Sequence, residues 1–378
     1  MKRISLQILM VSVCFASMAW SQTAGTCTNN WAEFHRPNLQ RWNPCEKVLD
    51  VSNVSSLALN WSYSTGNYVS SSPAVANGVV YVGSGDGNVY ALKATTGAKL
   101  WSFTTAHPIL SSPAVSKGVV YVASEDFNVY ALNAATGAML WSYKTISSVD
   151  SSPTVANGVV YVGSGLGDHN IYALDATSGA KLWSYATFDI VTSSPAVADG
   201  IVYVGAVDGY VYALDAKTGA KRWSYATNGE VFSSPAVANG VVYVGSSDNN
   251  VYALNAKTGA LLWFSPTLGS VSSSPAVANG VVYVGSQDSS VYALSAATGA
   301  KVWSYTTGQS VYDSSPAVAN GVLYIGSYDG YMYALNAKTG ARLWSLNTNL
   351  PVDSSPIVSN GVLYFGSWDH NVYAYGLN

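Results

Sequence analysis

Residues Ser233 to Trp263 read SSPAVANGVVYVGSSDNNVYALNAKTGALLW, and versions of this unit fill most of the 378-residue chain. Its Ser-Ser-Pro signature recurs with the proline at positions 73, 113, 153, 195, 235, 275, 316 and 356, which makes eight copies spaced 40 to 42 residues apart. A fixed period of this size is typical of solenoids and propellers, in which each repeat is one supersecondary unit. The chain is therefore an array of similar units.

Turn signals divide each unit into four short segments that favour β-structure. The Asn-Gly pair at 239–240 predicts a hairpin, because both central positions of a type I′ turn need a positive φ. The polar run at 248–250 and the Thr-Gly pair at 258–259 mark two further turns. No segment carries a long apolar stripe at helical spacing, so the sequence predicts an all-β fold with four antiparallel strands per repeat.

The two ends of the array indicate how it closes. The eighth copy stops at Tyr375 without a tryptophan strand, whereas an orphan strand of that type, residues 57–63, precedes the first copy. This arrangement is typical of a ring closed by strand exchange, which leaves no long edge unpaired. The sequence therefore predicts an eight-bladed β-propeller over residues 57–378, with the N-terminal strand completing the last blade.

The composition argues against nucleic acid as a partner. The formal net charge is −3, charged residues make up only 10% of the chain, and Lys and Arg are scattered singly. A nucleic-acid surface needs a basic patch that neutralises phosphates. We therefore expect no nucleic-acid partner, a protein partner in the envelope with carbohydrate as the alternative, and a monomer.

The first 21 residues have the features of a secretory signal peptide. Lys2 and Arg3 are followed by an apolar run from 4 to 19 and by small residues near Ser21. An uncleaved anchor is the alternative, although the run is short for a membrane span. Cys14 follows a valine rather than a small residue, which disfavours lipidation. We expect export to the periplasm or the extracellular side of the cell envelope, with no membrane span after cleavage.

Residues 22–56 lack the repeat and are expected to form a small cap on the propeller. Cys27 and Cys45 both lie in this segment. An even pair of cysteines in an exported chain predicts a disulfide. Two free thiols are the alternative.

A search for catalytic or metal-binding residues finds only repeated features. Each copy has one Asp in the turn between its second and third strands, at positions 86, 126, 168, 208, 248, 288, 329 and 369. One acid per turn lacks the several oxygens of a calcium site, so a turn-capping role is favoured. The serine pairs have no His and acid at a recurring spacing, and three scattered histidines predict no metal site. We predict no catalytic, cofactor or metal residue.

The stretch from Ala253 to Trp263 resembles the tryptophan-docking motif, AxDxxTGxxxW, of propellers of the pyrroloquinoline-quinone (PQQ) type. The motif recurs in seven copies, and the resemblance covers about 320 residues. In that family each tryptophan docks against the turn of the neighbouring blade. The resemblance implies this role for Trp61, which matches only the final motif position, and for Trp101, Trp141, Trp183, Trp223, Trp263, Trp303 and Trp344.

The resembled family includes quinoprotein dehydrogenases and non-enzymatic scaffolds similar to the outer-membrane assembly factor BamB. The dehydrogenases typically carry two adjacent cysteines over the quinone, Ca²⁺ ligands and long insertions. Here no two cysteines are adjacent and the blades are close to minimal length. The resemblance therefore implies a non-catalytic protein without a cofactor. A lipidated cysteine of the BamB type is also missing, and the segment with Cys27 and Cys45 is extra.

Differences between the copies identify the candidate binding face. Alternating strand direction places the nearly invariant Asn-Gly and Thr-Gly turns on one face, and the Asp turns and the links between copies on the other. The third copy has two extra residues around 165–169 and the seventh has one at Tyr312, and such insertions often mark a binding face. The candidate partner-binding residues on the variable face are Tyr68, Asp150, Glu230, Phe232, Asp313, Tyr328, Asp353 and Trp368.

Three functions are compatible with this face. The first is an exported scaffold or binding module for a protein partner, for example in cell-envelope or outer-membrane protein assembly. The second is a PQQ-dependent dehydrogenase, and the third is a carbohydrate-binding surface protein. Aromatic and acidic side chains suit a peptide edge, a sugar or a cation. Variation by drift on a solvated surface is the remaining alternative. The first function is preferred, because no group of residues supplies an activity.

Overall fold

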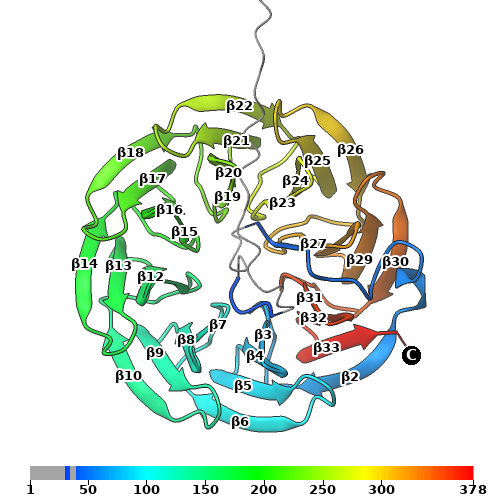
Figure 1. The fold of residues 1–378 in the computed structure, drawn as a ribbon, viewed down its shortest axis with the longest axis horizontal. Helices are drawn as coiled ribbons and strands as arrows, with labels where there is room; N and C mark the ends of the chain where they lie inside the picture. Colours follow the sequence, from blue (N-terminus) through cyan, green and yellow to red (C-terminus); the bar gives the residue numbers. More distant parts are fainter. Residues whose placement is uncertain (1–29, 35–39, 378) are drawn as a thin grey trace, which may run out of the picture.

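A computed structural model describes residues 30–34 and 40–377, and it shows eight sheets arranged around a central axis (Figure 1). The predicted all-β, eight-bladed propeller of four-stranded antiparallel blades is confirmed. Within the described ranges the only helical segment is the 3-10 turn η1 (Val54–Ser56). No helix in these ranges has the length and apolar character needed to cross a membrane.

The strands of each blade follow one another outward from the axis. The first four blades are β3 (Ala74–Ala76), β4 (Val79–Gly83), β5 (Asn88–Lys93) and β6 (Lys99–Thr104); β7 (Ala114–Ser116), β8 (Val119–Ala123), β9 (Asn128–Asn133) and β10 (Met139–Lys144); β11 (Thr154–Ala156), β12 (Val159–Gly163), β13 (Asn170–Asp175) and β14 (Lys181–Ala186); and β15 (Ala196–Ala198), β16 (Ile201–Gly205), β17 (Tyr210–Asp215) and β18 (Lys221–Ala226).

The remaining blades repeat the pattern, with two additions from the N-terminal segment. They are β19 (Ala236–Ala238), β20 (Val241–Gly245), β21 (Asn250–Asn255) and β22 (Leu261–Pro266); β23 (Ala276–Ala278), β24 (Val281–Ser286), β25 (Ser290–Ser295) and β26 (Lys301–Thr306); β27 (Ala317–Ala319), β28 (Val322–Gly326), β29 (Tyr331–Asn336) and β30 (Arg342–Asn347), with β1 (Trp42–Asn43); and β31 (Ile357–Ser359), β32 (Val362–Gly366) and β33 (Asn371–Gly376), with β2 (Ala58–Ser64).

Strand β2 closes the ring as predicted. It pairs antiparallel with β33, from Ala58 opposite Gly376 to Ser64 opposite Asn371, and so supplies the outer strand of the eighth blade. The register shifts by one residue just before Trp61, as it does before the outer-strand tryptophan of the other blades. The closing strand therefore reproduces the geometry of a complete blade.

At seven of the eight junctions, one carbonyl group joins a blade to the blade before it. Ala134 O of the second blade accepts a hydrogen bond from Trp101 Nε1 (2.9 Å) and another from the Tyr81 hydroxyl (3.1 Å), both of the first blade. The adjoining Gly137 has φ +74°, and a Cβ there would lie 2.7 Å from the Trp101 ring. Only glycine allows this approach. The same indole-to-carbonyl bond is made by Trp61, Trp141, Trp183, Trp223, Trp263 and Trp303.

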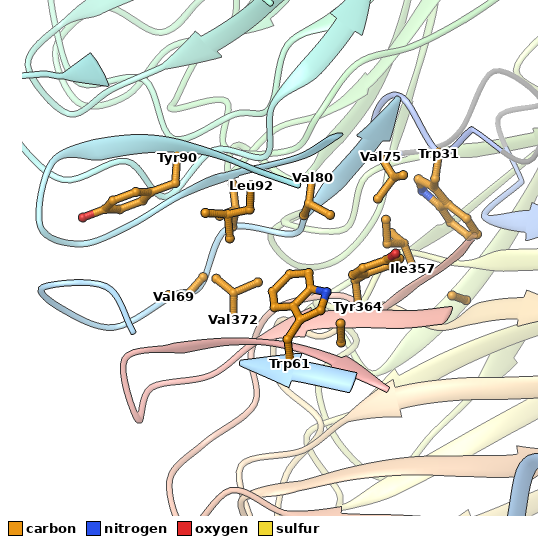
Figure 2. Close-up of a cluster of buried hydrophobic side chains, with 13 residues drawn as sticks. Trp31, Trp61, Val69, Val75, Val80, Tyr90, Leu92, Ile357, Tyr364 and Val372 are labelled. Carbon is orange, nitrogen blue, oxygen red and sulfur yellow. The ribbon is translucent and has the colours of Figure 1, made fainter. Parts of the chain in front are cut away.

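The junction between the last and first blades has the same contacts. Trp61 Nε1 and the Tyr364 hydroxyl both donate to Ala94 O, at 2.8 and 3.3 Å. Figure 2 shows these two rings facing Val80 and Leu92 of the first blade. The ring therefore closes with a buried apolar interface equivalent to those between other blades.

The junction between the seventh and eighth blades differs. The eighth blade ends without a Thr-Gly turn, and Trp344 instead packs against Tyr375, with the ring centroids 5.4 Å apart. The Tyr324 hydroxyl, which elsewhere in the ring would donate to the docking carbonyl, has no hydrogen-bond partner among the described residues. Leu49 and Val54 of the N-terminal segment pack into this junction. Trp344 thus departs from the docking role that the resemblance implied.

The described part of the N-terminal segment lies at the centre of the ring and runs outward to β2 (Figure 1). Trp31 forms an antiparallel bridge with Val75 of β3, and β1 pairs in parallel with β27. The described part of the segment thus packs on the innermost strands of the propeller. The signal peptide and Cys27 lie outside the described residues, so the leader and the disulfide with Cys45 stay predictions.

The Ser-Ser-Pro signature has a structural role. The hydroxyl oxygen of each second serine accepts the N–H of the equivalent serine one blade earlier, and the bond from Ser355 N to Ser72 Oγ (3.0 Å) completes the circle. The other members are Ser112, Ser152, Ser194, Ser234, Ser274 and Ser315. Eight hydrogen bonds therefore run around the axis.

The first serine of the pair forms hydrogen bonds within its blade and to the next blade. Substitution of Ser354, at the junction of the eighth and first blades, can measure what this serine contributes to stability. Ser354 Oγ accepts the Gly366 N–H (3.0 Å) and donates to Ser71 O of the first blade (3.1 Å), and its side chain is fully buried. We expect Ser354→Ala to lower the free energy of unfolding by about 1–3 kcal/mol, because a buried donor and acceptor lose their partner. Chemical denaturation measures this. Ser62→Ala, on the exposed side of β2, is the matched control, and equal effects of the two changes would contradict the expectation.

Candidate binding cavity

The Asp turns hold the links between blades on the variable face. Asp86 accepts the N–H of Gly66 in the preceding link (2.7 Å), the N–H of Asn88 (2.9 Å) and the hydroxyl of Tyr90 (2.6 Å). Equivalent tyrosine-to-aspartate bonds occur in the other seven blades. The oxygens of these carboxylates are thus used inside the fold, which favours the turn-capping role over a calcium site.

The links surround a cavity of about 540 Å³ on the propeller axis, hereafter the axial cavity. Its wall contains the residue immediately before the Ser-Ser pair of every blade, and most of the second serines lie below them. These eight wall positions are Ser70, Leu110, Asp150, Thr192, Phe232, Ser272, Asp313 and Asp353. Phe34 of the N-terminal segment also lines the cavity. One variable position per blade, in an otherwise monotonous repeat, therefore determines its chemistry.

Seven of the eight candidate partner-binding residues line this cavity. They are Tyr68, Asp150, Phe232, Asp313, Tyr328, Asp353 and Trp368. Glu230 does not line it and lies exposed on the same link, two residues before Phe232. Ser70, Thr192 and Ser272 were not predicted from the sequence, although they share the position before Ser-Ser with predicted residues such as Asp150 and Phe232.

Four aromatic rings form a continuous row along one side of the cavity. The ring centroids are 5.8 Å apart between Tyr312 and Tyr328, 5.9 Å between Tyr328 and Trp368, and 5.7 Å between Trp368 and Tyr68. These residues come from the seventh, eighth and first blades. Trp368 Nε1 also donates to Ser70 Oγ (3.1 Å), which fixes the indole in the row.

The carboxyl groups of Asp313 and Asp353 lie beside this row, and their surroundings disfavour the charged form of both. Asp353 is only 6% exposed, and its burial together with the neighbouring Asp313 raises its pKa to about 7. Asp313 is exposed to solvent within the cavity, yet desolvation by the surrounding walls raises its pKa to about 6. Across the cavity, burial also raises the pKa of Asp150. Among the described lining residues the cavity is therefore acidic, with three aspartates and no Lys, Arg or His.

A buried arginine, which is not among the residues lining the cavity, stacks on the Phe34 ring. The Arg41 guanidinium is 4.6 Å from the centroid of the Phe34 ring, and it donates to Phe34 O (2.6 Å), Pro316 O (2.8 Å) and Pro356 O (2.9 Å). Burial lowers its pKa to about 9, so it stays charged at neutral pH. Its hydrogen bonds go to backbone carbonyls, so Arg41 anchors the N-terminal segment and does not pair with the cavity carboxylates.

Several large apolar side chains stand exposed on the same face, outside the cavity. Leu268 and Leu350 lie singly on the links after the fifth and seventh blades, and four others lie together on the second and third blades and the links after them. Phe127, Ile146, Leu166 and Phe188 have exposed fractions of 42%, 72%, 75% and 82%, and they define what we call the apolar rim. They belong to the turns of the second and third blades and to the two links that follow them. Leu166 lies in the two-residue insertion of the third blade.

Backbone hydrogen bonds show that the members of the apolar rim are neighbours. The residue before Ile146 donates its N–H to Phe127 O (2.8 Å), and the Ile146 N–H donates to Asp168 Oδ2 (3.1 Å), in the turn that contains Leu166. The residue before Phe188 donates its N–H to the backbone of that same turn (2.9 Å). The rim therefore occupies one sector of the face, and the aromatic row occupies another.

The raised pKa of Asp353 predicts a pH-dependent stability. A carboxyl group whose pKa is higher in the folded state binds more protons there, so the free energy of unfolding falls as pH rises from about 4 to about 7. We expect Asp353→Asn to stabilise the protein at pH 8, and this gain to shrink by roughly 2 kcal/mol at pH 5. Thermal and chemical unfolding at both pH values measures the gain. Glu230→Gln removes an exposed charge as the control, and a gain that is independent of pH would contradict the prediction.

Comparison with known proteins supports the fold and identifies the family. A family model described as "Outer membrane protein assembly factor BamB" matches residues 50–189, 167–310 and 264–377. No curated protein matches the chain.

Solved structures of two kinds resemble the chain. BamB from Moraxella catarrhalis is 22% identical with a TM-score of 0.74, over 85% of this chain and 99% of that one. A europium-containing methanol dehydrogenase is 16% identical with a TM-score of 0.82, over 92% of this chain and 98% of that one. Quinohemoprotein alcohol dehydrogenase from Comamonas testosteroni is 16% identical with a TM-score of 0.82, covering 94% and 81%. At these identities the structures show a shared fold only, but the family matches together span nearly the whole propeller, so the chain belongs to the PQQ-like propeller family described as outer membrane protein assembly factor BamB.

Proposed function

We propose that this protein is a non-catalytic, exported binding module that presents the variable face of its propeller to a protein partner in the cell envelope. The observation that carries the proposal is the apolar rim. An exposed group of large apolar side chains on loops is typical of a protein-interaction site. The family description as an outer-membrane assembly factor and the signal-peptide features of residues 1–21 support a place in the envelope.

The axial cavity does not fit pyrroloquinoline quinone, the cofactor that some members of the fold bind. The quinone carries three carboxyl groups. The described lining residues supply three aspartates, Asp150, Asp313 and Asp353, and no Lys, Arg or His. Like charges in a partly desolvated site repel. The donor set therefore favours the non-catalytic function over a quinoprotein dehydrogenase.

The apolar rim can be tested by site-specific photocrosslinking in the cells that produce the protein. A photoreactive amino acid at position 146 or 188 is expected to yield one discrete adduct with another protein. The same amino acid at Lys117 or Asn239, in the Asn-Gly-type turns of the opposite face, is the control and is expected to yield none. Adducts from both faces in equal amounts, or from neither, would refute docking through the rim.

Matched substitutions then measure the contribution of the rim. With the captured partner in hand, Ile146→Ser with Phe188→Ser is expected to weaken binding at least ten-fold, because each buried side chain contributes about 1.5–3 kcal/mol. Both positions are exposed in the free protein, so its melting temperature should hardly change. An unchanged affinity would show that the partner docks elsewhere.

The non-catalytic part of the proposal has its own test. Purified protein supplied with pyrroloquinoline quinone and Ca²⁺ is expected to retain no quinone chromophore after gel filtration and to reduce no electron-acceptor dye with alcohols. The reason is that the aspartates in the cavity would repel the carboxylates of the quinone. Retention of the chromophore by the wild type, lost on changes in the cavity, would overturn this part of the proposal and leave the docking experiment unaffected.

A further inference from the structure

The most unusual part of the axial cavity is the sector formed by the seventh, eighth and first blades. There Asp313 and Asp353 lie on the links that enter the seventh and eighth blades, beside the row of Tyr312, Tyr328 and Trp368. The two aspartates are close enough for the charge of Asp313 to disfavour that of Asp353. Two adjacent carboxylates thus meet an aromatic wall inside one cavity.

Asp353 has an acceptor that the fold leaves unused. Its side chain is 94% buried, and Oδ1 has no hydrogen-bond partner among the described residues. Asp150 Oδ1, on another part of the wall, also has no hydrogen-bond partner among the described residues, although Asp150 is only half-buried. An unsatisfied buried acceptor costs free energy, and a buried carboxylate costs more. A ligand that donates a hydrogen bond and carries positive charge would relieve both costs.

The described fold supplies no cation for these carboxylates. The described lining residues include no Lys, Arg or His. Arg41 stacks on Phe34, and its N–H groups donate to backbone carbonyls. A metal ion is a poor match, because the described residues contain no group of three His, Cys, Asp or Glu side chains that could hold one. A neutral sugar hydroxyl could satisfy Oδ1 but would leave the repulsion between Asp313 and Asp353.

We propose that the axial cavity binds an organic cation, an alkylammonium or guanidinium group, between Asp353, Asp313 and the aromatic row. The positive charge interacts with the two carboxylates, and one N–H donates to Asp353 Oδ1. The apolar part of the ligand packs against Trp368 and Tyr328, whose ring faces also attract cations. The chemistry is the same for a free amine and for a basic side chain of another protein.

The inference does not depend on the apolar rim, which lies in another sector of the face. Ile146→Ser with Phe188→Ser is expected to leave cation binding unchanged. Loss of docking at the rim and loss of cation binding in the cavity are therefore separate results.

Isothermal titration calorimetry of the intact protein at pH 8 and low salt tests the inference. The cationic probes are 1,5-diaminopentane, as a free amine, and a short peptide with one central arginine. Their neutral counterparts are 1,5-pentanediol and the same peptide with citrulline. At least one cationic probe is expected to bind at least ten-fold more tightly than its neutral counterpart, and the stronger of the two indicates the source of the cation.

Three variants locate the binding. Asp353→Asn and Trp368→Leu are each expected to weaken binding of the cationic probe at least ten-fold, the first by removing charge and the second by removing the aromatic surface. Glu230→Gln removes one carboxylate from the same face outside the cavity and should leave the affinity within two-fold. Melting curves confirm that each variant is folded.

The results that would overturn the inference are distinct. They are no heat of binding with either cationic probe, equal binding of the neutral counterparts, or equal loss of affinity in Glu230→Gln and Asp353→Asn. Ca²⁺ binding that competes with the amine, and that needs Asp353, would replace the organic cation by a metal and would also refute it.

Discussion

The fold depends on a backbone carbonyl that, at seven of the eight junctions, accepts both an indole N–H and a phenol O–H from the preceding blade. A short four-stranded sheet has two apolar faces, and neither can be left in water. The carbonyl positions each blade on its neighbour, and a glycine with positive φ lets the indole approach it. At the last junction β2 supplies Trp61, so the first and last blades are held by the same pair of bonds.

This constraint also explains where the chain is free to vary. The Asp turns, the serine ring and the docking tryptophans use their polar atoms inside the fold, so these residues repeat almost unchanged. The residue before each Ser-Ser pair projects into the axial cavity and makes no equivalent bond. Asp313 and Asp353 therefore destabilise the folded state when charged, since partial desolvation raises the pKa of both. Ionisable groups that destabilise the folded protein in this way are typical of binding sites.

The candidate site could be predicted only in part. Aspartates and aromatic residues in the links differ from one copy of the repeat to the next, which made them recognisable in the sequence. Seven of the eight residues selected in this way line the cavity. Ser70 and Ser272 did not stand out, because they extend a run of serines. Ile146 and Phe188 were missed because sequence alone does not separate an exposed apolar side chain from a core one. Glu230 was selected, but the link directs Phe232 into the cavity and leaves Glu230 in solvent.

By itself the sequence determined the period, the strand content, the number of blades and the closing strand, because these follow from local turn signals and from the count of tryptophan strands. Tertiary structure alone decided the course of the N-terminal segment along the innermost strands, the exception at Trp344, and the meeting of Asp313, Asp353 and four aromatic rings in one cavity. The physical reason is that links about 40 residues apart in the chain become neighbours only when the ring closes around its axis.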